Sequence, residues 1–465
     1  MTLFNLTCIS AFTIVPLSIP GFGQTQTMPE RFGRPAAKVG YKTIGAAGRH
    51  SIRPATSTAA ERYVFGRADL AVGDAPYAVA VGAFQTGRPP SLAVANYFSN
   101  TVSILLANPD GTYQPQVTYA TGVEPDAIIA ADFDGDKAPD LAVANWASGT
   151  VSILLGNGDG TFQPHVDYAV GSGFVTGVIA ADFNRDGKLD LAATVEDTNA
   201  VAILLGNGDG TFQPQVSYSA GDSPEGAVAG DFNGDGFLDL AIPAGSDQVS
   251  ILMGNGNGTF QPPVQYATGA LPFGIVMGDF NGDGKLDLAT ANASSNTVSV
   301  LLGNGDGTFQ PHVDYDAGTQ PYALAVGDFN GDGKLDLAVT ANVDSTLSVL
   351  MGKGNGTFEP RKIYGTGLAP WGVVSADVNG DGKLDLVVAN TGFTWLSLTL
   401  TDNGHGFDPA HIARGHGLTS MEQRAAQLGG RLTVDSAPGR GTTVRLRVPI
   451  SQQFVGRRKK SYTNG

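Results

Sequence analysis

The sequence predicts an all-β fold, a seven-bladed β-propeller with four-stranded antiparallel blades. The first observation is a nine-residue phrase, Asp-Phe-Asn-Gly-Asp-Gly-Lys-Leu-Asp in its full form, that recurs every 48 to 50 residues. The second is composition: 64 glycines and 15% charged residues favour short strands joined by tight turns. Such a period, with four strand-like segments in each repeat, is typical of propeller blades. The seven copies begin at Ala83, Asp132, Asp182, Asp231, Asp279, Asp328 and Asp377.

One repeat, residues 322–368, illustrates the four expected strands. Residues 322–327 form a short apolar strand, the acidic phrase follows, and residues 337–340 form a second apolar strand. Residues 346–351 alternate with period two, and a glycine-rich hairpin leads to a more polar fourth strand. The apolar strands suit the buried inner part of a ring, and the fourth suits its rim. A straight solenoid is the alternative repeat architecture.

The N-terminal part of the repeat region predicts how the ring closes. Residues 65–73 stand in the phase of a fourth strand and precede the first strand of blade one. We expect them to supply the outer strand of the last blade, which removes an open edge. The propeller is therefore predicted to span residues 61–393.

The preceding residues predict export. Residues 1–23 contain an uncharged apolar stretch that ends in small residues, as in a secretory signal peptide. Residues 24–60, rich in Ala, Thr, Arg, Pro and Gly, are predicted to be a flexible linker. The only cysteine, Cys8, lies in the leader, so a processed chain would have no disulfide. We expect a secreted or cell-surface protein that is a monomer without a membrane span.

The net charge of −15 disfavours nucleic acid as a partner, because phosphate binding needs a basic surface. Of the 43 acidic residues, 19 lie in the six intact phrases. The charge is thus concentrated at candidate ion sites.

The acidic phrases predict calcium sites. Oxygen-bearing side chains stand at positions 1, 3, 5 and 9, and glycines at positions 4 and 6 let the backbone wrap tightly. Closely spaced oxygens are the ligands that Ca²⁺ takes, and neighbouring carboxylates repel one another without a cation. The alternative is a set of acidic turns that hold no ion. The candidate ligands of about six structural ions are Asp132, Asp134, Asp136, Asp140, Asp182, Asn184, Asp186, Asp190, Asp231, Asn233, Asp235, Asp239, Asp279, Asn281, Asp283, Asp287, Asp328, Asn330, Asp332, Asp336, Asp377, Asn379, Asp381 and Asp385.

These phrases, with the Leu-Leu-Gly-Asn-Gly-Asp-Gly-Thr-Phe-Gln-Pro hairpin at 301–311, resemble the FG-GAP/VCBS repeat family found in integrin alpha propellers. The resemblance covers residues 62–400 and implies a secreted or surface propeller with structural calcium, used for adhesion or ligand binding. Two copies depart from the pattern. Blade one, from Ala83 to Ser91, has lost every carboxylate and is expected to be empty, and blade two has Lys137-Ala-Pro139 where Gly-Lys-Leu is usual.

The face opposite the acidic loops is predicted to bind the ligand. The loops that enter each first strand carry Tyr77, Phe273, Tyr322 and Trp371, with Asp126 and Glu225 in the same phase. The loops after the second strands carry Asn96-Tyr97, Asn145-Trp146, Asn292, Asn342 and Asn390. Exposed aromatics beside amides would suit a carbohydrate or protein ligand. The alternative is that the aromatics plug the inner ring and that Ala-Asn marks a turn.

Catalysis by the propeller is not expected. Its histidines, His165 and His312, stand at the same repeat phase, and no Ser, His and Asp grouping breaks the symmetry of the repeat.

After Asn390 the pattern changes to a segment, residues 394–449, that resembles the end of the GHKL ATPase domain of bacterial sensor histidine kinases. Asp402, Gly404 and Gly406 match its first glycine box, and Gly415 and Gly417 match the second. The resemblance implies ATP and Mg²⁺ as ligands, with Asp402 at the adenine. The upstream helix of that family is missing, so we expect a truncated α/β fragment without activity. An ATP-binding signalling protein remains the alternative function, and residues 450–465 form a basic tail.

Overall fold

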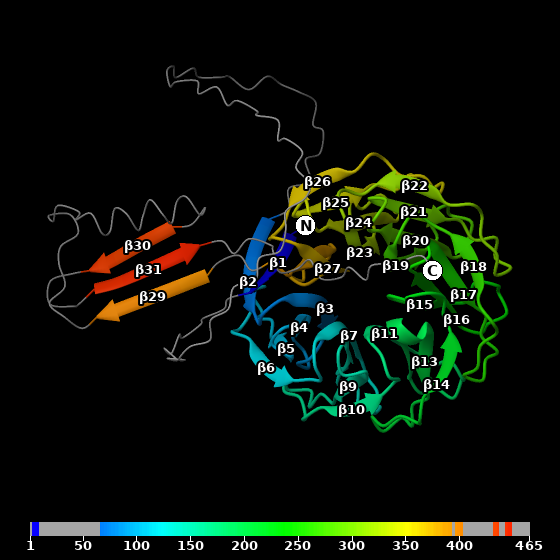
Figure 1. Ribbon diagram of the computed structural model, residues 1–465, viewed down its shortest axis with the longest axis horizontal. Coiled ribbons are helices and arrows are strands. Elements are labelled where there is room, and N and C mark those ends of the chain that lie inside the picture. Colours follow the sequence, from blue (N-terminus) through cyan, green and yellow to red (C-terminus); the bar gives the residue numbers. More distant parts are fainter. Residues whose placement is uncertain (1, 9–65, 393–395, 403–430, 437–441, 449–465) are drawn as a thin grey trace, which may run out of the picture. The chain divides into compact units, whose positions relative to one another are not determined.

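The computed structural model describes residues 2–8, 66–392, 396–402, 431–436 and 442–448 (Figure 1). Seven four-stranded sheets stand in a ring, and a three-stranded sheet follows in the sequence. The predicted linker at 24–60, most of the predicted leader and the basic tail lie outside the described residues.

Six of the ring sheets are regular antiparallel blades whose four strands follow one another along the chain. Blade one has β3 (Pro76–Gly82), β4 (Ser91–Asn96), β5 (Thr101–Leu105) and β6 (Val117–Ala120). Blade two has β7 (Pro125–Ala131), β8 (Asp140–Asn145), β9 (Thr150–Leu154) and β10 (Val166–Ala169). Blade three has β11 (Val175–Ala181), β12 (Asp190–Val195), β13 (Ala200–Leu204) and β14 (Val216–Ser219).

Blade four has β15 (Val228–Gly230), β16 (Asp239–Ala244), β17 (Gln248–Leu252) and β18 (Val264–Ala267). Blade five has β19 (Pro272–Gly278), β20 (Asp287–Asn292), β21 (Thr297–Leu301) and β22 (Val313–Asp316). Blade six has β23 (Pro321–Gly327), β24 (Asp336–Ala341), β25 (Thr346–Leu350) and β26 (Lys362–Gly365). The one described helix is a 3₁₀ turn, η1 (Glu196–Thr198), between β12 and β13.

Burial along a blade follows the polarity of its strands. All six residues of each second strand are buried, and the third strands are buried from their second or first residue onward. In the six regular blades the fourth strands are mostly exposed. Five of them begin with an exposed valine such as Val166 or Val313, and β26 begins with the exposed Lys362. Each hydrophobic core joins two adjacent blades: one contains Phe280 and Ala289 of blade five with Leu337 and Phe358 of blade six. The ring is therefore stabilised by packing between blades.

The seventh sheet closes the ring and differs from the prediction. Its strands lie in the order β2 (Gly66–Val72), β1 (Thr2–Cys8), β28 (Asp385–Asn390) and β27 (Pro370–Ala376). The expectation that residues 65–73 supply the outer strand is confirmed. The expectation of seven fully antiparallel blades is wrong for this sheet, because β1 pairs in parallel with both β28 and β2. The third-strand place is filled from the segment predicted to be a leader, so six blades are regular and the seventh is composite.

The last sheet has the order β29 (Leu396–Asp402), β31 (Thr442–Val448) and β30 (Arg431–Ser436), and both of its pairings are antiparallel. No helix in the described part of the chain is long and apolar enough to cross a membrane.

Candidate metal loops and ligand face

The conformation of the acidic loop in blade five is fixed by hydrogen bonds from its backbone to its own side chains. Asp279 accepts backbone N–H bonds from Gly282 at 2.7 Å and Gly284 at 2.8 Å. Asn281 accepts from the N–H of Asp283 at 2.8 Å, and Asp283 from Lys285 at 3.0 Å. These short-range bonds need positive φ at positions 4 and 6, which both glycines supply. Positions 1, 3 and 5 are thereby brought around one turn of backbone.

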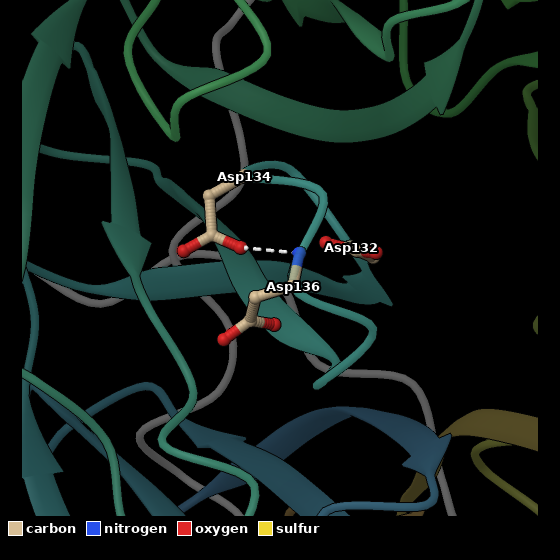
Figure 2. A group of neighbouring side chains, drawn as sticks. All are labelled: Asp132, Asp134 and Asp136. Atoms are coloured by element: carbon tan, nitrogen blue, oxygen red, sulfur yellow. Dashed lines mark hydrogen bonds between the residues drawn. The ribbon is translucent and has the colours of Figure 1, made fainter.

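Blade two shows this arrangement with three carboxylates. Asp132, Asp134 and Asp136 each place an oxygen within 4.8 Å of the others (Figure 2). Partial burial, opposed by the N–H of Asp136 and reinforced by the two neighbouring carboxylates, raises the pKa of Asp134 above its usual value. Three carboxylates at this spacing repel one another, and a hard divalent cation that takes oxygen ligands fits them.

Position 9 is built differently from positions 1, 3 and 5. Asp287 is fully buried; its Oδ2 accepts the N–H of Phe280 at 2.9 Å and its Oδ1 that of Gly303 at 2.8 Å. Asp140 of blade two is bonded in the same way and is not part of the group of three carboxylates. Burial raises the pKa of Asp140 and Asp287 to about 6, despite the lowering effect of the N–H bonds. The position-9 carboxylate thus ties the acidic loop to the hairpin of its own blade. The equivalent buried residues are Asp190, Asp239, Asp336 and Asp385.

The same loop hydrogen bonds recur in the other blades. The position-1 carboxylates of Asp182, Asp231, Asp328 and Asp377 each accept the N–H at position 6. Lys137 of blade two replaces glycine at that position, yet its N–H also reaches Asp132, at 2.9 Å, and its φ is 72°. Arg185 of blade three stands at position 4 with φ 64°. The unusual sequence of blade two therefore keeps the common loop geometry.

The acidic loops of blades two to five also contact the hairpin of the next blade. The carbonyl of Phe280 accepts the N–H of Gly356 at 2.9 Å, and that of Phe232 accepts the N–H of Gly307 at the same distance. The Phe280 ring meets the Phe358 ring edge-on at 5.6 Å, and Tyr315 meets Phe358 at 5.5 Å. This contact between blades was not predicted, although the phenylalanine at position 2 and the one in the hairpin are the residues that could have indicated it.

Blade one lacks the carboxylates and uses other contacts. The Ser91 hydroxyl stands where position 9 has aspartate, and it accepts the N–H of Ala107 at 3.0 Å. Thr86 donates its N–H to the carbonyl of Gly158 in the hairpin of blade two at 3.2 Å. The loop keeps its place between blades without an acidic residue.

At the opposite ends of the first strands, the predicted aromatic residues come together. Trp371 is stacked between Tyr322 at 4.0 Å and Tyr77 at 4.6 Å, and Phe273 meets Tyr322 edge-on at 4.8 Å. All four are half-buried. They form one aromatic cluster contributed by blades five, six, seven and one.

The cluster continues into Tyr97 and Trp146, the aromatics that follow the predicted asparagines of blades one and two. Tyr97 stacks on Tyr77 at 4.3 Å, lies 6.2 Å from Trp146, and donates its hydroxyl to Glu124 at 3.0 Å. Burial, the bond to Glu124 and neighbouring negative charge raise the pKa of the Tyr97 phenol far above its usual value. Trp146 stacks on Phe174 at 3.7 Å. Asp126 and Glu225, in the same repeat phase as Tyr77, are buried.

The asparagines predicted beside these aromatics lie inside the blades. Asn96, Asn145 and Asn292 are fully buried, and the side-chain amide of each donates to a threonine and a serine hydroxyl of the third strand. Asn342 donates to the carbonyl of Pro370. The amides fasten turns, as the alternative interpretation proposed, so the candidate ligand face is aromatic and acidic.

Serine, histidine and aspartate do meet, at the same phase of two blades. Ser299 Oγ donates to Asp314 Oδ1 at 2.6 Å, and His312 Nδ1 lies 2.9 Å from the same oxygen. Ser152, Asp167 and His165 repeat this arrangement. In a nucleophilic triad the imidazole stands between hydroxyl and carboxylate. Here hydroxyl and imidazole share one carboxylate oxygen, and the same His312 Nδ1 that faces Asp314 lies 3.4 Å from Ser299 Oγ, so the ring does not stand between them. The shared carboxylate links the third and fourth strands.

Asp402 is the last residue of β29, opposite Thr442 of β31. The other residues predicted to bind a nucleotide, Gly404, Gly406, Gly415 and Gly417, lie outside the described residues.

Comparison with known families gives two matches. The FG-GAP-like repeat matches residues 132–193, 182–242, 240–290, 279–339 and 336–388, more than half of the chain. The histidine kinase-, DNA gyrase B- and HSP90-like ATPase family matches residues 374–452. Both predicted resemblances are confirmed, and the two matches overlap in the seventh sheet.

Among curated proteins, the sensor histidine kinase LiaS of Bacillus subtilis is 38% identical over 64 residues, 14% of this chain and 18% of LiaS. A sensor-like histidine kinase of Chloroflexus aurantiacus is 38% identical over 59 residues, 11% of this chain and 10% of that protein. The chain thus spans less than a fifth of the length of these relatives.

Among solved structures, a Lactobacillus plantarum protein has a TM-score of 0.50 and 15% identity, covering 64% of this chain and 86% of that one. An Agrocybe aegerita lectin specific for non-reducing terminal N-acetylglucosamine has a TM-score of 0.44 and 21% identity, covering 62% and 80%. Saccharomyces cerevisiae Sqt1 has a TM-score of 0.48 and 9% identity, covering 81% and 97%. At these identities the likeness concerns the fold alone.

Proposed function

The chain belongs to the FG-GAP-like repeat family, and from that premise we propose that it is a calcium-binding propeller, secreted or held at the cell surface, that binds a carbohydrate or protein ligand. The calcium ions are structural, and the ligand lies on the face opposite the acidic loops. The propeller mediates adhesion or recognition and does not catalyse a reaction.

The observation that carries the proposal is the oxygen set of the acidic loops. In blade two, three carboxylates lie within 4.8 Å of one another. In blades three to seven the loop has the same aspartates at positions 1 and 5, and asparagine at position 3. Calcium would be held by the side chains at positions 1, 3 and 5, completed by further oxygens, and would neutralise their charge. Because the loops of blades two to five also contact the next blade, a bound ion there would stabilise the contact between blades.

Equilibrium dialysis and isothermal titration calorimetry with Ca²⁺ test this proposal. We expect about six ions per chain. Replacing Asp279, Asn281 and Asp283 together with alanine should remove one of them. The matched control replaces Gln85, Thr86 and Arg88 of blade one, and it should leave the stoichiometry unchanged. No saturable binding at millimolar Ca²⁺ would overturn the proposal.

The aromatic cluster supports the position of the ligand. Half-buried tryptophan and tyrosine rings give a large apolar surface whose polar edges can bond a sugar or a peptide. The cluster is contributed by four neighbouring blades, and acidic residues of blades two and four stand in the same phase.

A glycan array combined with pull-down from a surface extract tests the face. We expect Tyr322→Ala and Trp371→Ala each to abolish the signal and to leave the melting temperature of the calcium-loaded protein nearly unchanged. The control is Phe98→Ala, an exposed ring at the edge of the cluster, which should retain most of the signal. Signals that survive both cluster variants would place the ligand elsewhere.

Export rests on residues 1–23 and on the repeats, which are typical of extracellular proteins. Expression of the full chain in a secreting host should yield a medium fraction whose N-terminus lies near residue 24. A protein retained in the cytoplasm at full length would contradict export.

The ATPase-like match favours a second candidate function, ATP-dependent signalling. We propose that this segment is inactive, because it lacks the helix that holds the metal in that family. Titration of the purified chain with ATP and Mg²⁺ should show no binding at micromolar nucleotide. Micromolar affinity that is lost in Asp402→Ala would favour the second function.

A further inference from the structure

The strand directions of the seventh sheet reveal which of its strands is irregular. In a regular blade the second and fourth strands are both antiparallel to the third, and are therefore parallel to each other. In the seventh sheet β28 and β2 are both parallel to β1, so they too are parallel to each other. The second and fourth strands thus have their regular directions, and only β1 runs against the pattern. A strand antiparallel to β1 in that place would make the sheet a regular blade.

The sequence contains such a strand at the expected position. In blades one, two and five the third strand begins five residues after the second strand ends, as from Asn292 to Thr297. Five residues after Asn390 is residue 395, and β29 begins at Leu396. Leu396-Ser397-Leu398 follows Leu347-Ser348-Val349 of β25 at the repeat distance of 49 residues. By sequence phase, β29 is the third strand of the seventh blade.

The partners in the fourth strand agree with this assignment. Third-strand serines stand opposite fourth-strand aspartates in two blades, Ser152 with Asp167 and Ser299 with Asp314, and both pairs are hydrogen-bonded at 2.6 Å. Asp69 of β2 stands two repeats before Asp167, and Ser397 stands at the serine position. β29 in the third-strand place would set Ser397 opposite Asp69 and recreate this pair of residue types.

In the structure β29 belongs to the C-terminal sheet instead. All seven of its residues pair with β31, from Leu396 opposite Val448 to Asp402 opposite Thr442. One strand is therefore suited to two sheets, and it cannot be in both.

We propose that β1 and β29 compete for the place between β28 and β2. While β1 occupies it, β29 completes the C-terminal sheet. When β1 is removed, as it would be by processing of residues 1–23, β29 pairs antiparallel to both neighbours and the seventh blade becomes regular. The five-residue connection from β28 lets β29 reach this place once β1 is gone, because closing a short loop costs little entropy.

The exchange links the two ends of the chain. Moving β29 removes an edge strand from the C-terminal sheet, and with it Asp402, the residue that matches the adenine-binding aspartate. A regular seventh blade and an intact ATPase-like sheet are thus alternative states of the protein. The inference depends neither on calcium nor on the ligand face.

Disulfide trapping tests the proposal on the full chain, with Cys8→Ser as background. Ser397→Cys is combined either with Asp69→Cys, which reports the blade, or with Arg447→Cys, its register partner in β31. Each pair is oxidised in a chain with intact β1 and in a chain with Phe4→Pro and Leu6→Pro, since proline breaks the ladder of an inner strand. Prolines at Ala11 and Thr13, beyond β1, are the matched control.

We expect the 397–447 bridge with intact β1 and in the control, and its loss in favour of the 397–69 bridge when β1 is broken. A synthetic peptide of residues 2–8 should reverse the change. Replacing residues 2–8 by a Gly-Ser sequence provides a second route that needs no proline. Persistence of the 397–447 bridge in both β1 variants, absence of both bridges there, or a 397–69 bridge with intact β1 would overturn the proposal.

Discussion

Blades one and five have the same four strands but differ in the position-9 side chain that bonds to the hairpin. In blade five the Asp287 carboxylate holds both Phe280 of the acidic loop and Gly303 of the hairpin. In blade one the Ser91 hydroxyl holds only the hairpin, at Ala107. The core of blade one is as buried as that of blade five, with Leu92 and Val94 inaccessible to solvent. The fold of a blade therefore does not require the carboxylates.

The hairpin residue differs together with the carboxylate. A Cβ atom at Gly303 would lie 2.2 Å from the carbonyl oxygen of Leu286, and the equivalent glycines of blades two, three, four and six meet the same obstacle. Blade one has alanine there and proline in place of Leu286. Glycine and aspartate therefore form one unit, in which close approach of the hairpin lets the carboxylate reach the N–H of the glycine.

The largest expected effect is the loss of stability when calcium is removed, which should affect blade five and spare blade one. Chelation should lower the melting temperature markedly, since a site at a ligand concentration of about 100 Kd contributes about 2.7 kcal/mol. In hydrogen exchange, the acidic loops of blades two to seven should lose protection on chelation, and residues 83–91 of blade one should change least. An equal loss in blade one would contradict the assignment of calcium to the acidic loops.

Gly303→Ala should cause the second-largest loss of stability. The added Cβ meets backbone that cannot move aside without opening the hairpin, so we expect a loss of about 2–3 kcal/mol in the free energy of unfolding. Urea denaturation of the calcium-loaded protein measures it. Gly365→Ala is the control, because its Cβ would have no neighbour within 4 Å. Equal stability of the two variants would show that the close approach is unimportant.

Asp287→Ser gives blade five the position-9 side chain of blade one. The hydroxyl can serve Gly303 and leaves the buried N–H of Phe280 without its acceptor, which costs about 1–2 kcal/mol. The loss is measured by urea denaturation under chelation, so that calcium does not contribute. Ser91→Ala in blade one is the matched comparison, and we expect it to cost less. A neutral Asp287→Ser would mean that the carboxylate serves the ion alone.

The smallest expected effect is an increase in stability. Lys137 has a φ of 72°, a conformation that glycine adopts freely and that costs other residues about 1 kcal/mol. Lys137→Gly should therefore raise the free energy of unfolding by about 1 kcal/mol and keep the N–H bond to Asp132. Gly284→Lys in blade five should lower it by a similar amount. A loss of stability in Lys137→Gly would indicate that the lysine side chain stabilises blade two.

Much of the ring was predictable because each repeat of the sequence forms the same four-stranded unit. The spacing of the phrases gave the blades, and glycines at fixed positions gave the turns. Residues 65–73, in fourth-strand phase, indicated the closure. In the acidic loop of blade two, the carboxylates at positions 1, 3 and 5 lie within 4.8 Å of one another.

The rest depended on contacts between distant segments. Nothing in the pattern of residues 2–8 distinguishes a leader from an inner strand, because both are apolar and uncharged. Asp287 looked like another ion ligand, and only the packing of the hairpin shows its bonds to Phe280 and Gly303. Likewise, Asn96 and Asn292 looked like surface amides until burial placed them inside the turns.

The parallel pairing of β1 with β28 also has a mechanical consequence. Leu3 to Thr7 run beside Leu386 to Asn390 in the same direction. Tension applied between the start of β1 and the end of β28 would pull the strands along each other and load all their hydrogen bonds together. An antiparallel hairpin pulled at its two open ends instead breaks one bond at a time. While β1 is in place, the ring is closed by a joint that resists tension along the chain.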